Sequence, residues 1–290
     1  MRKINQYFYR HNQFTNFGDE LNEVILPKIF DIKANLVHAT KSNFIGIGSI
    51  LGTFYSSVTT YDDVPKIYAN KQKIDVWGSG FMRKPLQGEK FVPIMNFLAV
   101  RGKYTLQDLL YMKEISTKDY ENIALGDPGL LTPNIFPSSS KKTYRIGLIP
   151  HYIDLQKNKT IVTETFEKLG KLEETILIDP TWNLEKVIET ITSCQIIISS
   201  SLHGLIVADS YGIPNMWVRF SDDIIGGDYK FLDYYSIYDL EKTPKTIDLR
   251  EENILDYTKN IKKNYNIPYE KIEKTCKGLI EAFNKLIINI

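Results

Sequence analysis

Three consecutive serines and a histidine stand where a buried strand is expected to end and a helix to begin. In the segment 199–204, Ser-Ser-Ser-Leu-His-Gly, an apolar run precedes the serines, and an apolar helical pattern closed by Gly212 and Pro214 follows the glycine. The first turn of a helix carries backbone N–H groups without intrahelical partners, and the helix dipole favours negative charge there. The segment therefore predicts a site for a phosphate or carboxylate, with these binding residues: Ser199, Ser200, Ser201 and Gly204.

Two histidines are candidates for proton transfer. His203 lies in the first turn of the expected helix, and His151 follows an expected strand at Tyr144–Ile149. A helix start lowers the pKa of an imidazole whereas a bound phosphate raises it, so the sequence leaves the net shift of His203 open. For His151, a loop histidine without catalytic duty is the alternative. We predict that these two histidines are the catalytic residues.

Three cations are candidates for holding the anionic ligand. Arg101 follows an expected strand, Arg219 ends another, and Lys230 lies shortly after it. A solvated surface charge is the alternative for each of them, since most Lys and Arg side chains are exposed.

Two glycine-containing turns are predicted to bind a second ligand. The first holds Asn16, Gly18 and Asp19, and the second holds Gly78 and Ser79. Glycine lets a ligand approach the backbone closely. The alternatives are that Asp19 only caps the following helix and that the second turn is merely tight. Gly126-Asp127-Pro128 is interpreted as a structural turn.

Short apolar runs alternate with helical patterns along most of the chain, which is typical of an α/β fold with largely parallel sheets. The segment 132–142, rich in Pro, Ser and Lys, is interpreted as a linker between two Rossmann-like domains, 1–138 and 139–290. Ligands of open parallel sheets bind beside the carboxyl ends of strands, so a cleft between the domains is expected to hold the site. The expected elements are strands at 4–9, 44–47, 74–77, 97–101, 144–149, 175–178, 195–199 and 215–218, and helices at 20–30, 159–169, 184–192, 202–211 and within 254–290.

Composition excludes several classes of function. The chain of 290 residues carries 36 Lys and Arg against 35 Asp and Glu, so no global positive charge attracts nucleic acid. Only two cysteines are present, and the four histidines are scattered, which argues against a disulfide framework and a metal site. The first residues lack the apolar run of a signal peptide, and no later run is long enough to span a bilayer. We expect a cytoplasmic protein that needs no metal.

The segment around His203 resembles the signature of polysaccharide pyruvyl transferases, Ser-Ser-Arg-Leu-His-Gly followed by an apolar helix and Gly-x-Pro. Further pieces of the resemblance occur in order, at 16–19, 77–80, 100–102, 126–128 and 149–152, with a weaker echo at 230–234. The resemblance implies a glycosyltransferase-B-like arrangement of two domains. The amino-terminal domain would be on the acceptor side and the carboxyl-terminal domain on the donor side.

The resemblance also implies a reaction. Phosphoenolpyruvate, a co-substrate and not a cofactor, donates its pyruvyl group to a saccharide, usually as a cyclic ketal, and releases phosphate. The acceptor would be a lipid-linked or nucleotide-linked saccharide in capsule or exopolysaccharide biosynthesis. Association with membrane assembly machinery at the inner face of the membrane is then an open alternative to a purely cytoplasmic location.

One departure from the signature affects the donor site. Ser201 stands where the family commonly has arginine, so the cation expected there must come from another residue or the donor must differ. Two other functions therefore stay open: a two-domain glycosyltransferase that uses a nucleotide sugar, and a non-catalytic saccharide-binding member of the assembly machinery.

Overall fold

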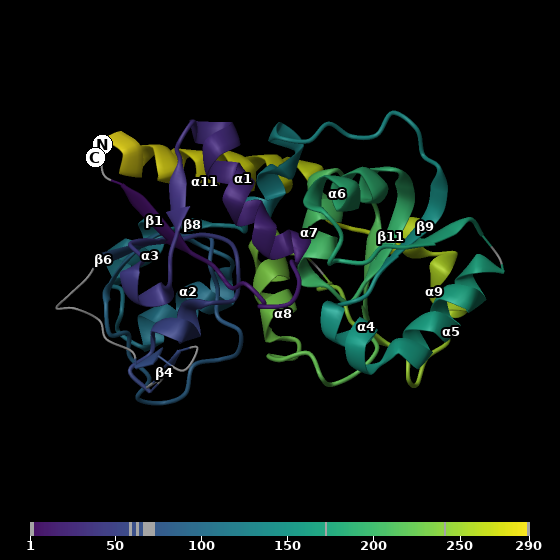
Figure 1. Ribbon diagram of the computed structural model, residues 1–290, viewed down its shortest axis with the longest axis horizontal. Coiled ribbons are helices and arrows are strands. Elements are labelled where there is room, and N and C mark those ends of the chain that lie inside the picture. Colours follow the sequence, from purple (N-terminus) through teal and green to yellow (C-terminus); the bar gives the residue numbers. More distant parts are fainter. Residues whose placement is uncertain are drawn as a thin grey trace.

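The computed structural model describes residues 3–57, 60–61, 64–65, 73–171, 173–240 and 242–288. Two parallel sheets form its two halves, the first at the left of Figure 1 and the second at the right. The first has the order β2-β1-β3-β6-β7-β8, and its strands are Ile4–Tyr7 (β1), Ala34–Leu36 (β2), Phe44–Ile45 (β3), Lys73–Trp77 (β6), Ile94–Val100 (β7) and Ala124–Leu125 (β8). A small antiparallel pair, β4 (Thr60–Tyr61) and β5 (Val64–Pro65), stands apart from it.

The second sheet is built in the same way. Its order is β10-β9-β11-β12-β13, and its strands are Tyr144–Ile149 (β9), Thr175–Leu177 (β10), Cys194–Ser199 (β11), Asn215–Arg219 (β12) and Ile247–Asp248 (β13). All strand pairs in both sheets are parallel. Parallel strands need crossover connections, and helices supply most of these here.

In both sheets the strand order reverses next to the first strand. The chain places β2 on one side of β1 and β3 on the other, and it repeats this around β9 with β10 and β11. At such a switch point the connections leave in opposite directions, and a crevice opens beside the carboxyl ends of the strands. The topology therefore marks the ends of β1, β3, β9 and β11 as the place for a ligand.

Helices cover the sheets and connect the strands. The first, α1, begins at Phe17, because the side chain of Asn16 accepts a hydrogen bond from Gly18 N and caps the helix. The prediction of Asp19 as the cap is wrong: Asp19 lies inside the first turn. The helices are α1 Phe17–Phe30, α2 Lys103–Tyr111, α3 Thr117–Asn122, α4 Tyr152–Lys157, α5 Lys159–Gly170, α6 Leu184–Thr192, α7 Leu202–Ser210, α8 Tyr229–Tyr235, α9 Leu255–Thr258, α10 Ile261–Asn264 and α11 Tyr269–Ile288, with short 3-10 turns at Ala39–Lys41, Leu51–Phe54, Pro128–Asn134 and Ser236–Tyr238.

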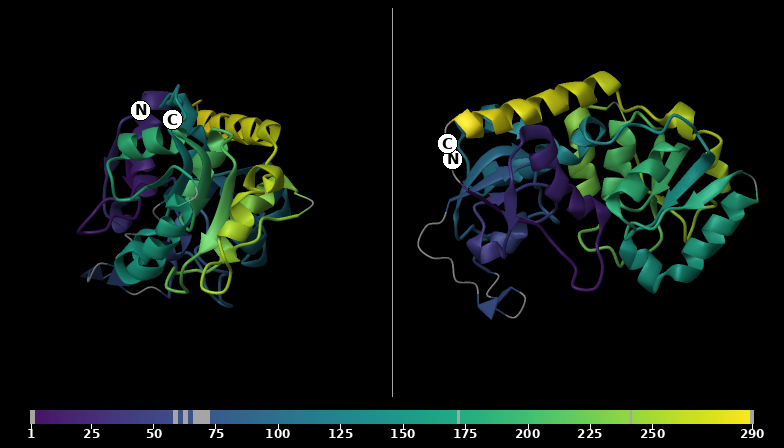
Figure 2. Two further views of the ribbon diagram at one scale, coloured as in Figure 1. Left: turned by 90° about the vertical axis from the view of Figure 1, so that its right-hand side faces the viewer. Right: turned by 45° about the horizontal axis from the view of Figure 1, so that its top comes forward.

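The last helix, α11, returns to the first half of the molecule. Figure 2 shows it lying along the first sheet, with both chain ends close together. Its apolar side enters the core there, where Phe283 contacts Phe30 and Trp77, at ring-centroid distances of 4.3 and 4.9 Å. Trp77 Nε1 also donates a hydrogen bond of 2.9 Å to Leu279 O. Residues from opposite ends of the sequence thus complete one core.

The α/β class with two parallel sheets is confirmed. The glycosyltransferase-B-like arrangement and the division at residue 138 stay predictions. The expected linker falls on the end of the Pro128–Asn134 turn and the irregular stretch that leads into β9.

Candidate active site

A cavity of about 260 Å³ lies at the place that the topology marks. Segments after β1, β3, β6, β9, β11 and β12 line it, together with residues of α1, α4, α7 and α8. The contributing residues include Tyr9 after β1, Gly48 to Ile50 after β3, His151 and Tyr152 after β9, Ser201 and His203 after β11, Asn16 and Asp19 at the start of α1, and Lys230 on α8. Both halves of the chain therefore contribute to one site.

The three serines have different surroundings. Ser199 Oγ accepts a hydrogen bond from Ser201 N at 2.9 Å and contacts Ile149 O, and Ser200 Oγ donates to Asp154 Oδ2 at 2.7 Å. Both are fully buried and hold the turn between β11 and α7. Ser201 is the serine that lines the cavity, at the N-cap of α7. Gly204 serves close packing, since a Cβ there would lie 2.5 Å from Ser199 Oγ.

His203 stands between the cavity and a buried carboxyl group. Its ring lies against Gly18, where a Cβ would come within 2.0 Å of Nδ1. Its Nε2 is 3.9 Å from Asp127 Oδ2, and neither atom has a hydrogen-bond partner among the described residues. Burial, with Lys230 and then Arg101 nearby, lowers the pKa of His203 to about 3. Burial raises the pKa of Asp127 to about 6. The imidazole of His203 is thus neutral at neutral pH.

His151 is the N-cap of α4 and lies next to the turn between β11 and α7. Its Nδ1 accepts a hydrogen bond from Ile153 N at 3.3 Å, and its backbone N–H donates to Ser200 Oγ at 2.8 Å. Burial lowers its pKa well below the usual value, and Lys230 and His203 add to this effect. A bound anion would oppose both charge effects.

Lys230 brings an ammonium group into the cavity. The residue is 6% exposed, and burial lowers its pKa to about 8, helped by Arg101 and opposed by Asp19 and Asp154. Asp19 also lines the cavity, and burial raises its pKa to about 7 against the effect of Lys230. An acid and a base that both titrate near neutral pH therefore face one space.

Arg101 lies behind the cavity wall. Its guanidinium group, 1% exposed, pairs with Asp233 Oδ2 at 2.9 Å and donates to Phe81 O and to Ser49 Oγ. Because Ser49 lines the cavity, Arg101 supports the wall from the first sheet. Asp233 is one turn beyond Lys230 on α8, so this buried pair also fixes the helix that carries the ammonium group.

The remaining predicted residues lie outside the cavity. Arg219 pairs with Asp228 and Asp222 beside a separate surface hollow. Gly78 has a φ of +92° and packs against Pro128, while Ser79 Oγ donates to Gly46 O. The structure places these residues in supporting positions.

Sequence reasoning missed three carboxyl groups around the site. Asp127 faces His203, Asp154 accepts from Ser200 and from Ser221, and Asp233 pairs with Arg101. Asp127 lies in the Gly-Asp-Pro piece that is interpreted above as structural. Asp154 and Ser200 are 46 residues apart in the sequence, and Asp233 and Arg101 are 132 residues apart. Local sequence patterns do not reveal such distant partners.

Two features are absent from the described part of the chain. Its helices include none that is long and apolar enough to cross a bilayer. The same residues include no group of three or more His, Cys, Asp or Glu side chains placed to hold a metal ion.

Comparison with known proteins identifies the family. A sequence model described as polysaccharide pyruvyl transferase matches residues 95–222, which include β9, β11 and α7. The chain is 31% identical over 240 residues to the uncharacterized protein L143 of Acanthamoeba polyphaga mimivirus, covering 81% of this chain and 75% of the relative. It is 21% identical over 245 residues to the succinoglycan biosynthesis protein ExoV of Rhizobium meliloti, covering 83% of this chain and 67% of that protein.

No solved structure matches the chain at a significant level. The matched segment contains both histidines of the cavity and the strand ends that position them. The chain is therefore a transferase and belongs to the polysaccharide pyruvyl transferase family.

Proposed function

We propose that the cavity binds phosphoenolpyruvate and transfers its pyruvyl group to a saccharide as a ketal. The observation that carries this proposal is the buried ammonium group of Lys230, which lies beside the start of α7 and two neutral imidazoles. A cation and unpaired helix N–H groups favour a ligand with a carboxylate and a phosphate. Lys230 would then supply the positive charge of the family's arginine, whose position Ser201 occupies in this chain.

The proposed reaction assigns a proton to each site group. A saccharide hydroxyl oxygen bonds to C2 of the donor as its methylene carbon gains a proton, and the C2–O bond to phosphate then breaks with its electron pair. A second hydroxyl of the saccharide then attacks the resulting cation. The proton of this second hydroxyl goes to the released phosphate. His203 or His151, protonated while the anionic donor is bound, supplies the proton to the methylene carbon, and Asp19 accepts the proton of the first hydroxyl.

The outer part of the cavity would hold the acceptor. Tyr9, 41% exposed, and Tyr152 lie at its rim, one from each half of the chain. Tyr152 also contacts Phe14, with ring centroids 5.0 Å apart. Aromatic rings of this kind provide apolar faces for a sugar ring. The setting we propose is exopolysaccharide or capsule synthesis on a lipid-linked or nucleotide-linked acceptor, in the cytoplasm or at the inner membrane face.

Donor binding and turnover test the proposal separately. Phosphoenolpyruvate should raise the Tm of the protein, because a ligand that binds the folded state stabilises it. Phosphate release should then depend on an added saccharide. Lys230→Ala should abolish the Tm shift and lower turnover by about 100-fold or more, as for loss of a charge-stabilising group. Lys277→Ala, at a position 79% exposed on α11, is the matched control.

A nucleotide-sugar glycosyltransferase is the second candidate, because Ser201 removes the family arginine. A nucleotide sugar that stabilises the protein while phosphoenolpyruvate does not would favour it. Saccharide binding that persists without turnover, and survives His203→Ala, would instead indicate a non-catalytic binder.

We also propose that the reaction needs no metal ion or organic cofactor. Turnover should survive prolonged treatment with a chelator. Loss of turnover that added Mg²⁺ restores would contradict this part of the proposal.

A further inference from the structure

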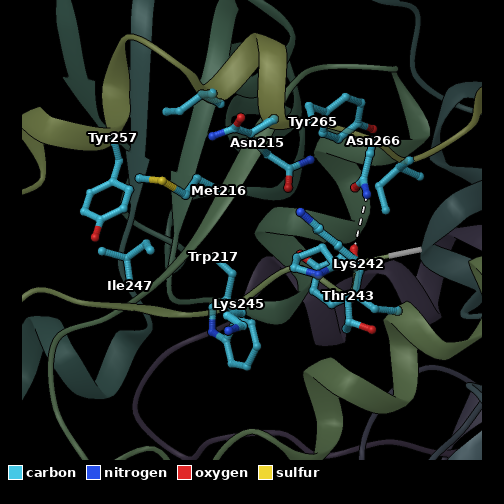
Figure 3. A pocket seen from close by; sticks show the side chains of 15 residues that line it. Asn215, Met216, Trp217, Lys242, Thr243, Lys245, Ile247, Tyr257, Tyr265 and Asn266 are labelled. Atoms are coloured by element: carbon cyan, nitrogen blue, oxygen red, sulfur yellow. Dashed lines mark hydrogen bonds between the residues drawn. The ribbon is translucent and has the colours of Figure 1, made fainter. Parts of the chain in front are cut away.

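A second cavity, of about 330 Å³, lies at the other end of the second sheet (Figure 3). It is bounded by the start of β12, by the segment 242–247, by residues of α9 and α10, and by the stretch 264–267. It shares no lining residue with the candidate active site. The first cavity follows the carboxyl ends of strands, whereas this one begins at the amino end of β12.

The cavity exists because the sheet is incomplete at this edge. β13 pairs with β12 only at Val218 and Arg219, so the described chain places no strand beside residues 215–217 on that side. Residues 242–245 line the cavity beside this open edge. Asn266 Nδ2 holds that segment through a hydrogen bond of 3.2 Å to Lys242 O, drawn as a dashed line in Figure 3.

The floor of the cavity is fixed before any ligand binds. Trp217 stacks on Phe231, with ring centroids 4.4 Å apart and planes 14° apart. Asn215 Nδ2 and the Tyr265 hydroxyl donate to buried Asp209 Oδ1 at 2.6 and 2.8 Å. The Oδ1 of Asn215 remains available as an acceptor. A preformed floor reduces the ordering cost of binding.

The positive charge of the lining favours an anionic ligand. The lining contains Lys242 and Lys245 and no Asp or Glu, and within the described ranges neither ammonium group has a carboxylate within 4 Å. Three asparagines and Thr243 add neutral groups that bond hydroxyls, and Tyr257 adds a ring. Rings, amides and unpaired cations together suit a saccharide that carries carboxylate groups.

We propose that this cavity binds an acidic saccharide at a site separate from the transferase centre. It would hold an acidic portion of a glycan away from the residues that act on the acceptor. The choice of a saccharide rests on the proposed function, but binding here requires neither phosphoenolpyruvate nor turnover.

Calorimetric titration with a tetragalacturonate tests the site, and its carboxyl-reduced neutral counterpart is the comparison ligand. The acidic form should bind more tightly, and added salt should weaken it. Replacing Lys242 and Lys245 together by Ala should weaken binding about tenfold, as expected for two partly exposed charges. Tyr257→Ala should weaken the binding of both saccharides, because it removes an aromatic ring from the cavity wall.

Two controls separate this site from others. Lys259→Ala with Lys263→Ala removes two exposed lysines of neighbouring segments that are outside the lining, and binding should persist. Binding should also persist in Lys230→Ala, even if donor binding and turnover fail. Equal affinity for the neutral saccharide, loss of binding only in Lys230→Ala, or tighter binding of uridine monophosphate would each overturn the proposal.

Discussion

At the scale of single residues, burial sets the protonation of the candidate site. It brings the pKa of Asp19 up to about 7 and that of Lys230 down to about 8, so each group changes charge close to neutrality. Groups whose pKa lies near the working pH are efficient in proton transfer. The proposed mechanism needs Asp19 ionised and Lys230 protonated at the same time.

We predict a bell-shaped pH dependence of kcat/KM, with limbs near the pKa values of these two residues. Asp19→Asn should lower kcat by about 100-fold or more, as for loss of a general base, and should remove the acidic limb. Lys230→Arg should move the alkaline limb upwards, because a guanidinium group stays protonated. Initial rates of phosphate release across the pH range provide the measurement. An unchanged acidic limb in Asp19→Asn would exclude Asp19 as the base.

Asp209 gives a prediction on stability. Burial raises its pKa from 3.8 to about 6 despite hydrogen bonds from Tyr234, Asn215 and Tyr265. Between these two values the folded chain keeps a proton that the unfolded chain releases, so this group's contribution to stability falls as pH rises. The loss amounts to about 3 kcal/mol for a shift of this size. Asp209→Asn should flatten that part of the profile of unfolding free energy, measured with urea; an unaltered slope would contradict the assignment.

The sequence predicted some of the residues that line the cavity and missed some of the carboxyl groups around it. His203, His151, Ser201, Asn16 and Asp19 line the cavity and were predicted because they follow strands or stand near glycine, and Lys230 was predicted as a candidate cation. The sequence could not show whether Ser199 and Ser200 bind a ligand or only hold the turn, because a hydroxyl group can do either. The partners of the buried carboxyl groups come from distant segments, and only the folded chain brings them together.

At the scale of elements, α8 is the connection between the two halves near the site. Lys230 and Asp233 lie one turn apart on it, so the ammonium group and the anchor of the helix move together. Asp233 also accepts hydrogen bonds from Thr105 N and Thr105 Oγ1, both at 2.8 Å, which joins α8 to the start of α2.

We predict that Asp233→Ala destabilises the protein by about 3 to 5 kcal/mol, because it leaves the buried Arg101 charge uncompensated. The double variant Arg101→Met with Asp233→Leu should recover part of this loss, since no unpaired charge then remains. Denaturant unfolding of both variants is the measurement. A double variant less stable than Asp233→Ala would show that the charge is not the main cost.

Element types were predictable where the apolar pattern is long. The strands Tyr144–Ile149 and the helix Leu184–Thr192 have the expected bounds. The short edge strands β2, β8 and β13 escaped prediction, because two or three residues carry too little periodicity. The start of α1 was misplaced because Asn16 and Asp19 are both good caps, and only the backbone decides between them.

At the scale of the whole molecule, α11 joins the end of the sequence to the first sheet. Its amphipathic pattern predicted a helix with one buried side. The pattern does not show which sheet that side packs against. Phe283 is fully buried among aromatic residues of the first half. The core of the first half therefore also contains a residue from the last helix.

We predict that Phe283→Ala lowers the unfolding free energy by about 3 to 5 kcal/mol, the usual cost of the cavity that loss of a core aromatic residue leaves. Ile288→Ala on the same helix, at a position 82% exposed, should have little effect. Thermal or urea unfolding of the two variants is the measurement. Equal effects would indicate that α11 does not pack as described.

The return of α11 also affects how the protein forms on the ribosome. The strands of the first sheet are all translated by Leu125, yet the helix that covers part of that sheet begins only at Tyr269. Until then the rings of Trp77 and Phe44 lack the Phe283 partner that shields them from water. The nascent amino-terminal half should therefore expose aromatic side chains that chaperones can bind, and the first sheet should reach its final stability only after α11 has left the ribosome.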